Sequence, residues 1–233
     1  ISPEQLFPKE QNAKTLRKLI SDLEPLKNMG EICKNDIYHS FRNFDTKMLA
    51  WIENIKEGQS AFDNIEKERI PHKIENGKIV FNKNKNGDKY SRCYWDKIAP
   101  CVHTRNDILA SQNTVHPSDN RVFSIRELML MMTIPDTFKW SELDFDTLNN
   151  ISLTEKRKYL KEEELNIRHC IGESVPTIIF STIAKNIKKA LNHKQLSTND
   201  INKVIEENNL LEKENLKKFL IKNLLKHDLN SLY

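Results

Sequence analysis

Residues 171–191, IGESVPTIIFSTIAKNIKKAL, decide the fold of this chain because they combine a glycine, a proline and a long periodic apolar pattern. The pattern predicts a tight Gly turn that opens directly into an amphipathic helix, and on spacing alone an ordinary capped core helix accounts for it. Gly172 suits a backbone with positive φ or one that another segment approaches closely. Ser174 suits the N-cap and Pro176 the first helical turn, where free N–H groups would face whatever lies in front of the helix. The apolar stripe consists of Val175, Ile178, Ile179, Ile183, Ala184, Ile187 and Leu191.

The composition is that of a soluble globular protein with one large domain or two small ones: 233 residues, 38% apolar, 30% charged. The net charge of +4 permits a nucleic-acid partner without demanding one. Four scattered cysteines without a CxxC pair indicate reduced thiols in a cytosolic protein. No apolar run approaches the ~18 residues that span a bilayer, and the sequence has no signal-peptide pattern, so we expect no membrane partner. A first residue other than Met predicts a fragment or a processed product.

The first half of the chain predicts two helices before any strand. Apolar spacing indicates a helix over residues 16–23, and a second helix is expected with Asp45 as its N-cap and Gly58 as its C′ residue. Aromatic and basic side chains accompany the second helix. We assign Trp51 to the core and leave Arg42 open between a core role and DNA contact.

A change of pattern after Pro71 predicts a long β-hairpin. Residues 78–81 (KIVF) and 90–95 (YSRCYW) are β-prone, and the polar run 82–89 between them reads as the turn. Its lysines, Lys83 and Lys85, either contact phosphate or only solubilise the tip, and the two interpretations are equally favoured.

Further helices are expected in the second half. Ser124 and Glu127 have the spacing of a capping box, and Pro135 ends that helix. In the tail, residues 196–210 and 216–225 predict two amphipathic helices. These are interpreted as solvated packing helices, with a partner or subunit interface as the alternative.

Three segments resemble, in the same order, the last conserved motifs of DNA (cytosine-5) methyltransferases. Residues 91–105, SRCYWDKIAPCVHTR, resemble the penultimate motif, which runs Arg, then Trp-Asp-Lys-Pro-Ser-Pro-Thr-Ile, then Thr-Arg. Residues 116–139, HPSDNRVFSIRELMLMMTIPDTFK, resemble its continuation from His-Pro to Pro-Asp-x-Phe. Residues 168–191 contain IGESVP, which resembles the turn Ile-Gly-Asn/Glu-Ser/Ala-Val-Pro of the last motif. Residues 15–26 are also similar to the segment that often opens the recognition domain.

The resemblance implies an α+β chain that forms the C-terminal part of such an enzyme. A target-recognition domain of residues 1–140, with a short twisted sheet and long loops, would precede a helical part of residues 141–233. The helix 172–191 would line the S-adenosylmethionine pocket and dock on a catalytic N-terminal domain or subunit. The chain would bind duplex DNA sequence-specifically in a bacterial-type cytoplasm, associated with the nucleoid. A non-catalytic specificity subunit or regulator, and a helical interaction domain, remain alternatives.

The resemblance also implies site residues. Glu173 stands where Asn is commoner, which replaces an amide by an acceptor-only carboxylate at neutral pH. The cofactor-side residues are Gly172, Glu173, Ser174 and Val175. The DNA-contacting residues are Arg92, Thr104, Arg105 and Arg126, with Lys83 and Lys85 as weaker candidates, and Arg126 is an ion-pair or phosphate partner.

No catalytic residue and no metal site are expected in this chain. The nucleophile of the family is a Pro-Cys cysteine with Gly and Pro before it and usually Gln after it. Pro100-Cys101 has Ile-Ala before it and Val-His after it, and it belongs to a different motif, in which Ile98 and Cys101 themselves depart from the usual Pro and Thr. The spacing of Cys93, Cys101, His103 and His116 matches no zinc pattern.

Overall fold

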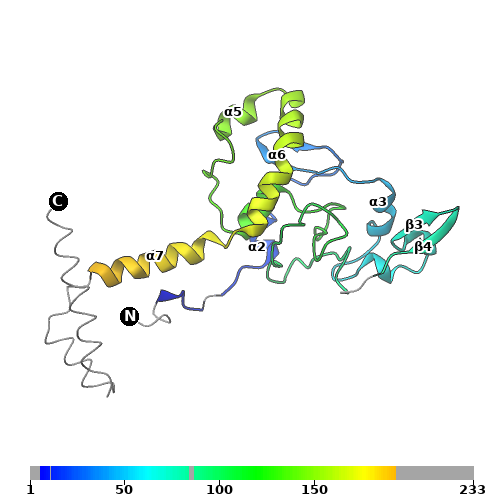
Figure 1. Cartoon of the computed structure of the whole chain (residues 1–233), viewed down its shortest axis with the longest axis horizontal. Helices are drawn as coiled ribbons and strands as arrows, with labels where there is room; N and C mark the ends of the chain where they lie inside the picture. Colours follow the sequence, from blue (N-terminus) through cyan, green and yellow to red (C-terminus); the bar gives the residue numbers. More distant parts are fainter. Residues whose placement is uncertain (1–5, 11, 84–86, 193–233) are drawn as a thin grey trace, which may run out of the picture. The chain divides into compact units, whose positions relative to one another are not determined.

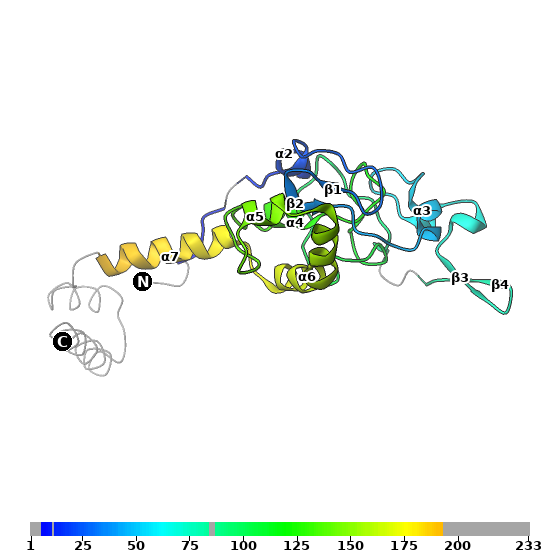
Figure 2. The same cartoon turned by 90° about the horizontal axis from the view of Figure 1, so that it is seen from above.

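Short helices and two small hairpins, rather than one large sheet, organise the chain (Figures 1 and 2). The structure is a computed structural model that describes residues 6–10, 12–83 and 87–192. It divides into the unit Lys9–Ser181 and a unit formed by Ile1–Pro8 with Thr182–Tyr233. The predicted domain boundary at residue 140 falls inside the first of these units. The predicted tail helices lie outside the described residues.

The mixture of helices and small antiparallel sheets agrees with the predicted α+β class. The helices are α2 (Leu16–Ile20), α3 (Lys47–Ile52), α4 (Ile125–Met131), α5 (Phe145–Asn150), α6 (Leu153–Glu173) and α7 (Thr177–Asn192), with 3₁₀ turns η1 (Ala61–Asp63) and η2 (Lys67–Arg69). Strand β1 (Ile32–Cys33) pairs with β2 (Asp36–Ser40), and β3 (His72–Glu75) pairs with β4 (Lys78–Phe81).

Helix α4 lies at the centre of the unit Lys9–Ser181, in contact with α2, β2 and α6. Its Leu128 and Met129 are buried, together with Ile167 and Ile171 of α6. Each such side chain contributes about 1.5–3 kcal/mol through its burial. The apolar face of α4 therefore packs against α6 and holds the segments 116–139 and 168–191 together. A second apolar cluster surrounds Trp51, whose assignment to the core is confirmed.

The β3–β4 hairpin differs from the predicted one in its pairing. Strand β4 has the predicted bounds, but its partner is β3, with His72 opposite Phe81 and Glu75 opposite Lys78. Asn76 and Gly77 join them with φ of 51° and 73°, the positive values that a type I′ turn requires. The predicted partner 90–95 instead makes isolated bridges, such as that of Arg92 with Val115. The predicted pairing was wrong because the local Asn-Gly turn closes a tighter hairpin.

The caps around α3 also depart from expectation. Thr46, not Asp45, occupies the N-cap position, although Oδ1 of Asp45 accepts the N–H of Lys47 at 3.1 Å. The helix ends at a C-cap, Glu53, so Gly58 is not its C′ residue. Gly58 does adopt a positive φ of 78°, and a Cβ there would lie 1.8 Å from Oη of Tyr94. Its role is to let the Tyr94 ring pass.

The junction of α6 and α7 corrects the prediction for residues 171–177. Helix α6 continues through Gly172 to Glu173, and Ser174 is its C-cap, with Oγ donating to the carbonyl of Ile171 at 2.8 Å. Ser174 is therefore not the N-cap of the following helix, which begins at Thr177. Pro176 lies just before that start and accepts the N–H of Ile179 at 3.0 Å.

Other local predictions are confirmed. Helix α2 begins at the expected residue, with Thr15 as its N-cap. Ser124 and Glu127 form both bonds of the capping box. In the second unit, the described residues contribute the rest of α7, and Nδ2 of Asn186 donates to the carbonyl of Leu6 at 3.1 Å.

Candidate functional site

The three segments that resemble methyltransferase motifs meet at the C-terminal half of α6. Gly172 lies against the loop that contains His103 and Thr104, and a Cβ on it would be 2.5 Å from backbone atoms of both residues. Its φ is not positive, so of the two reasons offered for glycine, close approach of another backbone is the one that applies. The last motif thus packs directly on the end of the penultimate one.

Arg168 fixes this contact from one turn further back in α6. Its side chain is 1% exposed, and its Nη2 donates to the carbonyl of Phe123 at 2.9 Å, which brings in the middle segment. Its Nη1 donates to the carbonyl of Asn106 at 3.3 Å, and Nδ2 of Asn106 donates back to the carbonyl of Arg168 at 2.9 Å. The second hydrogen of Nδ2 goes to the carbonyl of His103 at 2.7 Å. One buried arginine therefore ties together all three segments.

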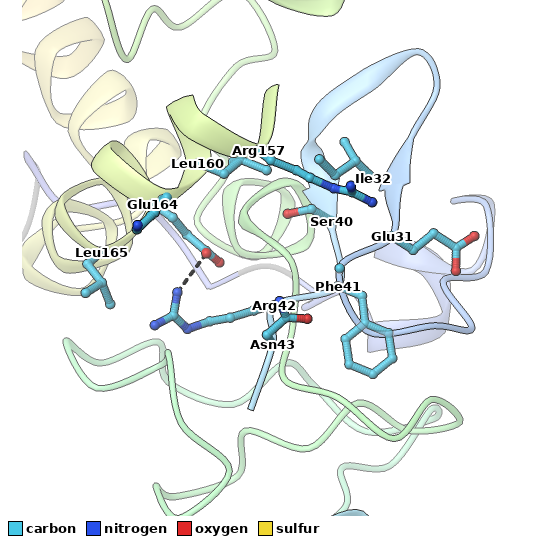
Figure 3. A pocket seen from close by; sticks show the side chains of 12 residues that line it. Glu31, Ile32, Ser40, Phe41, Arg42, Asn43, Arg157, Leu160, Glu164 and Leu165 are labelled. Carbon is cyan, nitrogen blue, oxygen red and sulfur yellow. Dashed lines mark hydrogen bonds and ion pairs between the residues drawn. The ribbon is translucent and has the colours of Figure 1, made fainter. Parts of the chain in front are cut away.

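Glu164 joins Arg168 to the strand side of the unit. Its Oε2 accepts a hydrogen bond from Nη1 of Arg42 at 2.7 Å (Figure 3). Its Oε1 accepts one from Nε of Arg168 at 2.8 Å. Nε of Arg42 also donates to the carbonyl of Asp107 at 3.3 Å. Arg42, which the sequence left open between a core role and DNA contact, thus forms a partly exposed ion pair within the unit. The sequence analysis did not single out Glu164 and Arg168, although their i, i+4 spacing is a helix ion-pair signal.

Arg92 lies in a buried part of the same unit. The residue is 4% exposed, and burial lowers the pKa of its guanidinium. Its nitrogens donate to the carbonyls of Ile52, Ile55, His116 and Asp119 and to Oδ1 of Asn120. This arrangement gives Arg92 a bracing role between loops, because no donor is left directed to solvent.

A buried charge cluster supports the capping box of α4. Glu127 accepts two bonds from Arg121, at 2.7 and 2.9 Å, and the N–H of Ser124 at 2.6 Å. Burial alone would raise the pKa of Glu127, but the charge and hydrogen bonds of Arg121 outweigh it and hold the pKa at about 2. Burial lowers the pKa of the neighbouring His116 to about 4. Glu127 therefore serves as a structural anion.

Arg126 adopts the ion-pair role that was one of its two expected roles. Its guanidinium bonds the carboxylate of Asp36 on β2 and lies 5.2 Å from the ring centroid of Phe145. The residue is 6% exposed. It joins α4 to β2 and α5, away from solvent.

Comparison with known proteins identifies the family. The sequence profile of the C-5 cytosine-specific DNA methylases matches residues 1–189. The chain belongs to this family. It is 29% identical over 197 residues to the type II methyltransferase M1.HgaI of Avibacterium volantium, covering 78% of this chain and 46% of that protein. It is 27% identical over 186 residues to the type II methylase M.HgiDII of Herpetosiphon aurantiacus, covering 78% and 45%.

A eukaryotic relative matches a shorter region. DNA (cytosine-5)-methyltransferase CMT3 of Arabidopsis thaliana is 36% identical over 80 residues, which cover 31% of this chain and 9% of that protein. The chain thus spans about half the length of the first two relatives that it matches.

The expected DNA-contacting residues separate into two groups. Arg92 and Arg126 are buried and saturated by internal acceptors, as described above. The side chain of Arg105 is 64% exposed, with Nε 3.1 Å from Oδ1 of Asp107. Thr104 is partly exposed, Lys83 is exposed, and Lys85 lies outside the described residues. The solvent-facing group contains Thr104 and Arg105 on the loop that Gly172 supports.

The residues expected on the cofactor side separate in the same way. Gly172 and Ser174 are used by internal contacts, whereas the side chain of Glu173 is 63% exposed and Val175 is 44% exposed. The first N–H groups of α7 are also in use, because the N–H of Thr177 donates to the carbonyl of Met132 and that of Ile178 to Oγ1 of Thr133. A carboxylate acceptor beside an apolar side chain fits the hydroxyl and amino donors of an adenosyl cofactor. The exposed carboxylate of Glu173 lies 3.5 Å from Nδ1 of His169, beside the exposed side chain of Val175.

The four cysteines of the chain all fall within the described residues. Burial raises the pKa of the Cys93 thiol to about 12, and it also raises that of Cys33. Cys101 and Cys170 are exposed. Across residues 6–10, 12–83 and 87–192, no group of three His, Cys, Asp or Glu side chains is arranged to hold a metal ion. In the same ranges, no helix is both long and apolar enough to cross a membrane.

Proposed function

We propose that this chain is the C-terminal target-recognition portion of a DNA cytosine-5 methyltransferase. It binds duplex DNA sequence-specifically and completes the cofactor pocket of a catalytic domain that is not part of these 233 residues. The observation that carries the proposal is the packing of Gly172 on Thr104, fixed by Arg168. This contact links two segments. One contains Gly172 and resembles the cofactor-side motif, and the other is the loop that presents Arg105 to solvent.

Helix α7 supports the proposal of a catalytic partner. Ile178, Phe180 and Ile187 are 55%, 58% and 41% exposed, so the helix carries large apolar side chains that the described residues leave open to solvent. Exposed apolar side chains on one element indicate a surface that another protein surface covers. In the proposed function this surface is a catalytic domain, either in the same polypeptide or in a second subunit.

In this proposal, two side chains of the chain contact the cofactor. Members of the family take their methyl group from S-adenosylmethionine. Glu173 and Val175 would hold one edge of that cofactor, the carboxylate by accepting hydrogen bonds and the Val side chain by excluding water. Gly172 and Ser174 act through the backbone position of Glu173, because their own contacts are internal.

The DNA contact can be tested with a matched pair of arginines. Arg105 and Arg17 are both exposed and both pair with an aspartate, Asp107 and Asp96 respectively, but only Arg105 lies on the supported loop. We expect Arg105→Ala to weaken binding of the chain to duplex DNA and to lower the salt slope of log K by about 0.9, the value for one phosphate contact. Arg17→Ala should leave both unchanged. Fluorescence anisotropy with labelled duplexes over a salt series measures this.

Two outcomes oppose the proposal. Absence of any duplex binding at low salt would remove the recognition function. Equal effects of Arg105→Ala and Arg17→Ala would mean that the loop has no special part in DNA binding.

A further inference from the structure

A cleft of about 410 Å³ lies between the β1–β2 hairpin and α6, outside the contact between Gly172 and Thr104 (Figure 3). Its lining combines apolar side chains, among them Phe41 and Leu160, with cations from both walls. Arg42 comes from the segment after β2, and Arg157 and Lys161 come from α6. In Figure 3, Arg157 extends across the cleft toward the hairpin, whereas Arg42 turns toward α6.

The two carboxylates that line the cleft are already satisfied within the protein. Glu164 is shared by Arg42 and Arg168. Oε2 of Glu31 accepts two backbone N–H groups of its own loop at 2.8 Å each, and these bonds lower the pKa of its carboxyl group. The charge of Glu164 is therefore neutralised by two arginines, whereas Glu31 keeps its charge on the hairpin side of the cleft, opposite the cations of α6.

The cations on α6 have no such partner. Arg157 and Lys161 are four residues apart, so they project from one face of the helix. Both are exposed, and among the described residues no carboxylate oxygen lies within 4 Å of either charged group. Together with Arg42, the lining carries three cations and two carboxylates. The two cations without a carboxylate partner, Arg157 and Lys161, face solvent.

We propose that this cleft binds the phosphodiester backbone of a DNA strand outside the bases that the chain reads. The proposal rests on the proposed function and adds a sequence-independent contact to it. Unpaired cations attract phosphates whatever the base sequence. The cleft adjoins the loop that presents Arg105, because Asp107 pairs with Arg105 through its side chain and accepts from Arg42 through its carbonyl. One strand can therefore follow both surfaces.

The test removes the two unpaired charges without touching the structural ones. The double variant Arg157→Gln, Lys161→Gln should lower the salt slope of log K by about 1.8, or ~0.9 for each lost phosphate contact. It should weaken binding to two unrelated duplex sequences by the same factor. Phosphate ethylation interference on the duplex should lose signals outside the protected bases. Thermal unfolding checks that the variant is folded, since both side chains are exposed.

The matched control removes the same charge elsewhere. Lys158→Gln with Lys139→Gln takes away two exposed cations that do not line the cleft, one of them on α6 itself. This control should keep the salt slope of the unchanged chain. An equal loss in the control, or an unchanged slope in the cleft variant, overturns the proposal while DNA binding by the unchanged chain keeps the proposed function. Failure of the unchanged chain to bind any duplex removes both.

A further arm separates a strand backbone from a free phosphate ion. Inorganic phosphate and chloride, compared at equal ionic strength, should displace the duplex equally. Selective displacement by phosphate would assign the cleft to a small anion and overturn the phosphodiester assignment.

Discussion

A single methyl group at Gly172 is enough to separate α6 from the loop that it supports. In an exposed helix interior, replacement of Gly by Ala raises stability by about 0.5–1 kcal/mol. Here the new methyl would lie 2.5 Å from backbone atoms of His103 and Thr104, which cannot rotate away as a flexible side chain does. We therefore expect Gly172→Ala to lower the free energy of unfolding by about 1–3 kcal/mol. Urea unfolding followed by circular dichroism gives the sign, and a higher midpoint would contradict the close approach.

His116 provides a prediction on pH at the same scale. Its Nδ1 accepts the N–H groups of Ser118 and Asp119 at 3.2 and 2.9 Å, so that nitrogen carries no proton. Burial lowers the pKa of His116 from 6.5 to about 4 in the folded chain. Between these values the unfolded chain binds more protons, so stability is present above pH 6.5 and is lost as pH falls toward 4. We expect His116→Asn, which keeps an acceptor but does not titrate, to flatten this loss.

The measurement is a series of urea unfolding curves between pH 7.5 and 5.5. This range stays about one unit above 4.5, the ordinary pKa that the carboxyl of Glu127 has when unfolded, and it covers the start of the loss that His116 causes. Equal slopes for the unchanged chain and His116→Asn would show that another group causes the acid sensitivity.

At the scale of elements, α6 is the support on which the 101–107 loop depends. Arg168 bonds Asn106 and Phe123 from within the helix, and it is almost completely buried. Arg168→Met would remove these bonds while Glu164 keeps Arg42 as a partner. Because the buried carbonyls of Asn106 and Phe123 lose this donor, we expect stability to fall by about 1–3 kcal/mol for each of them. Amide hydrogen exchange should rise first in residues 101–107. Lys158→Gln on the same helix should change neither quantity.

Sequence patterns at this scale succeeded where the signal was local. Ser124 and Glu127 lie in one turn, so their capping box follows from spacing alone. Strand β4 has its own β-branched run, and its bounds were predicted without its partner. Its pairing with β3 was also readable, because Asn76-Gly77 is a strong turn signal, but the longer polar run after it was favoured instead.

Patterns failed where a distant contact decides the structure. Gly172 and Ser174 resemble a turn in sequence, yet α6 continues through Gly172. Glycine occurs there because the backbone of Thr104 lies too close for a side chain. Arg92 and Arg126 matched family positions, but their burial depends on loops and strands far along the chain. Sequence analysis therefore identified the segments of the site better than the exposure of their side chains.

At the scale of the whole molecule, the chain should not methylate DNA by itself. The Cys93 thiol is held protonated by burial, and Cys101 has neither the sequence neighbours nor the motif position of the family nucleophile. We expect no incorporation when the chain is incubated with duplex DNA and labelled S-adenosylmethionine. Reproducible label at C5 of cytosine would contradict this prediction. DNA binding measured on the same preparation is the control that the chain is folded.

Thr133 joins α4 to α7, and its backbone conformation and its side-chain hydrogen bond favour different residue types. Its φ is 53°, a conformation unfavourable for a β-branched residue. Its hydroxyl accepts the N–H of Ile178 at 3.0 Å, and its carbonyl accepts the hydroxyl of Thr177. Glycine would relieve the backbone but discard the hydroxyl, whereas asparagine tolerates the conformation and keeps a side-chain acceptor. A laboratory library of residue 133 selected only for heat resistance should therefore enrich asparagine, which meets both demands, above glycine, which meets only one.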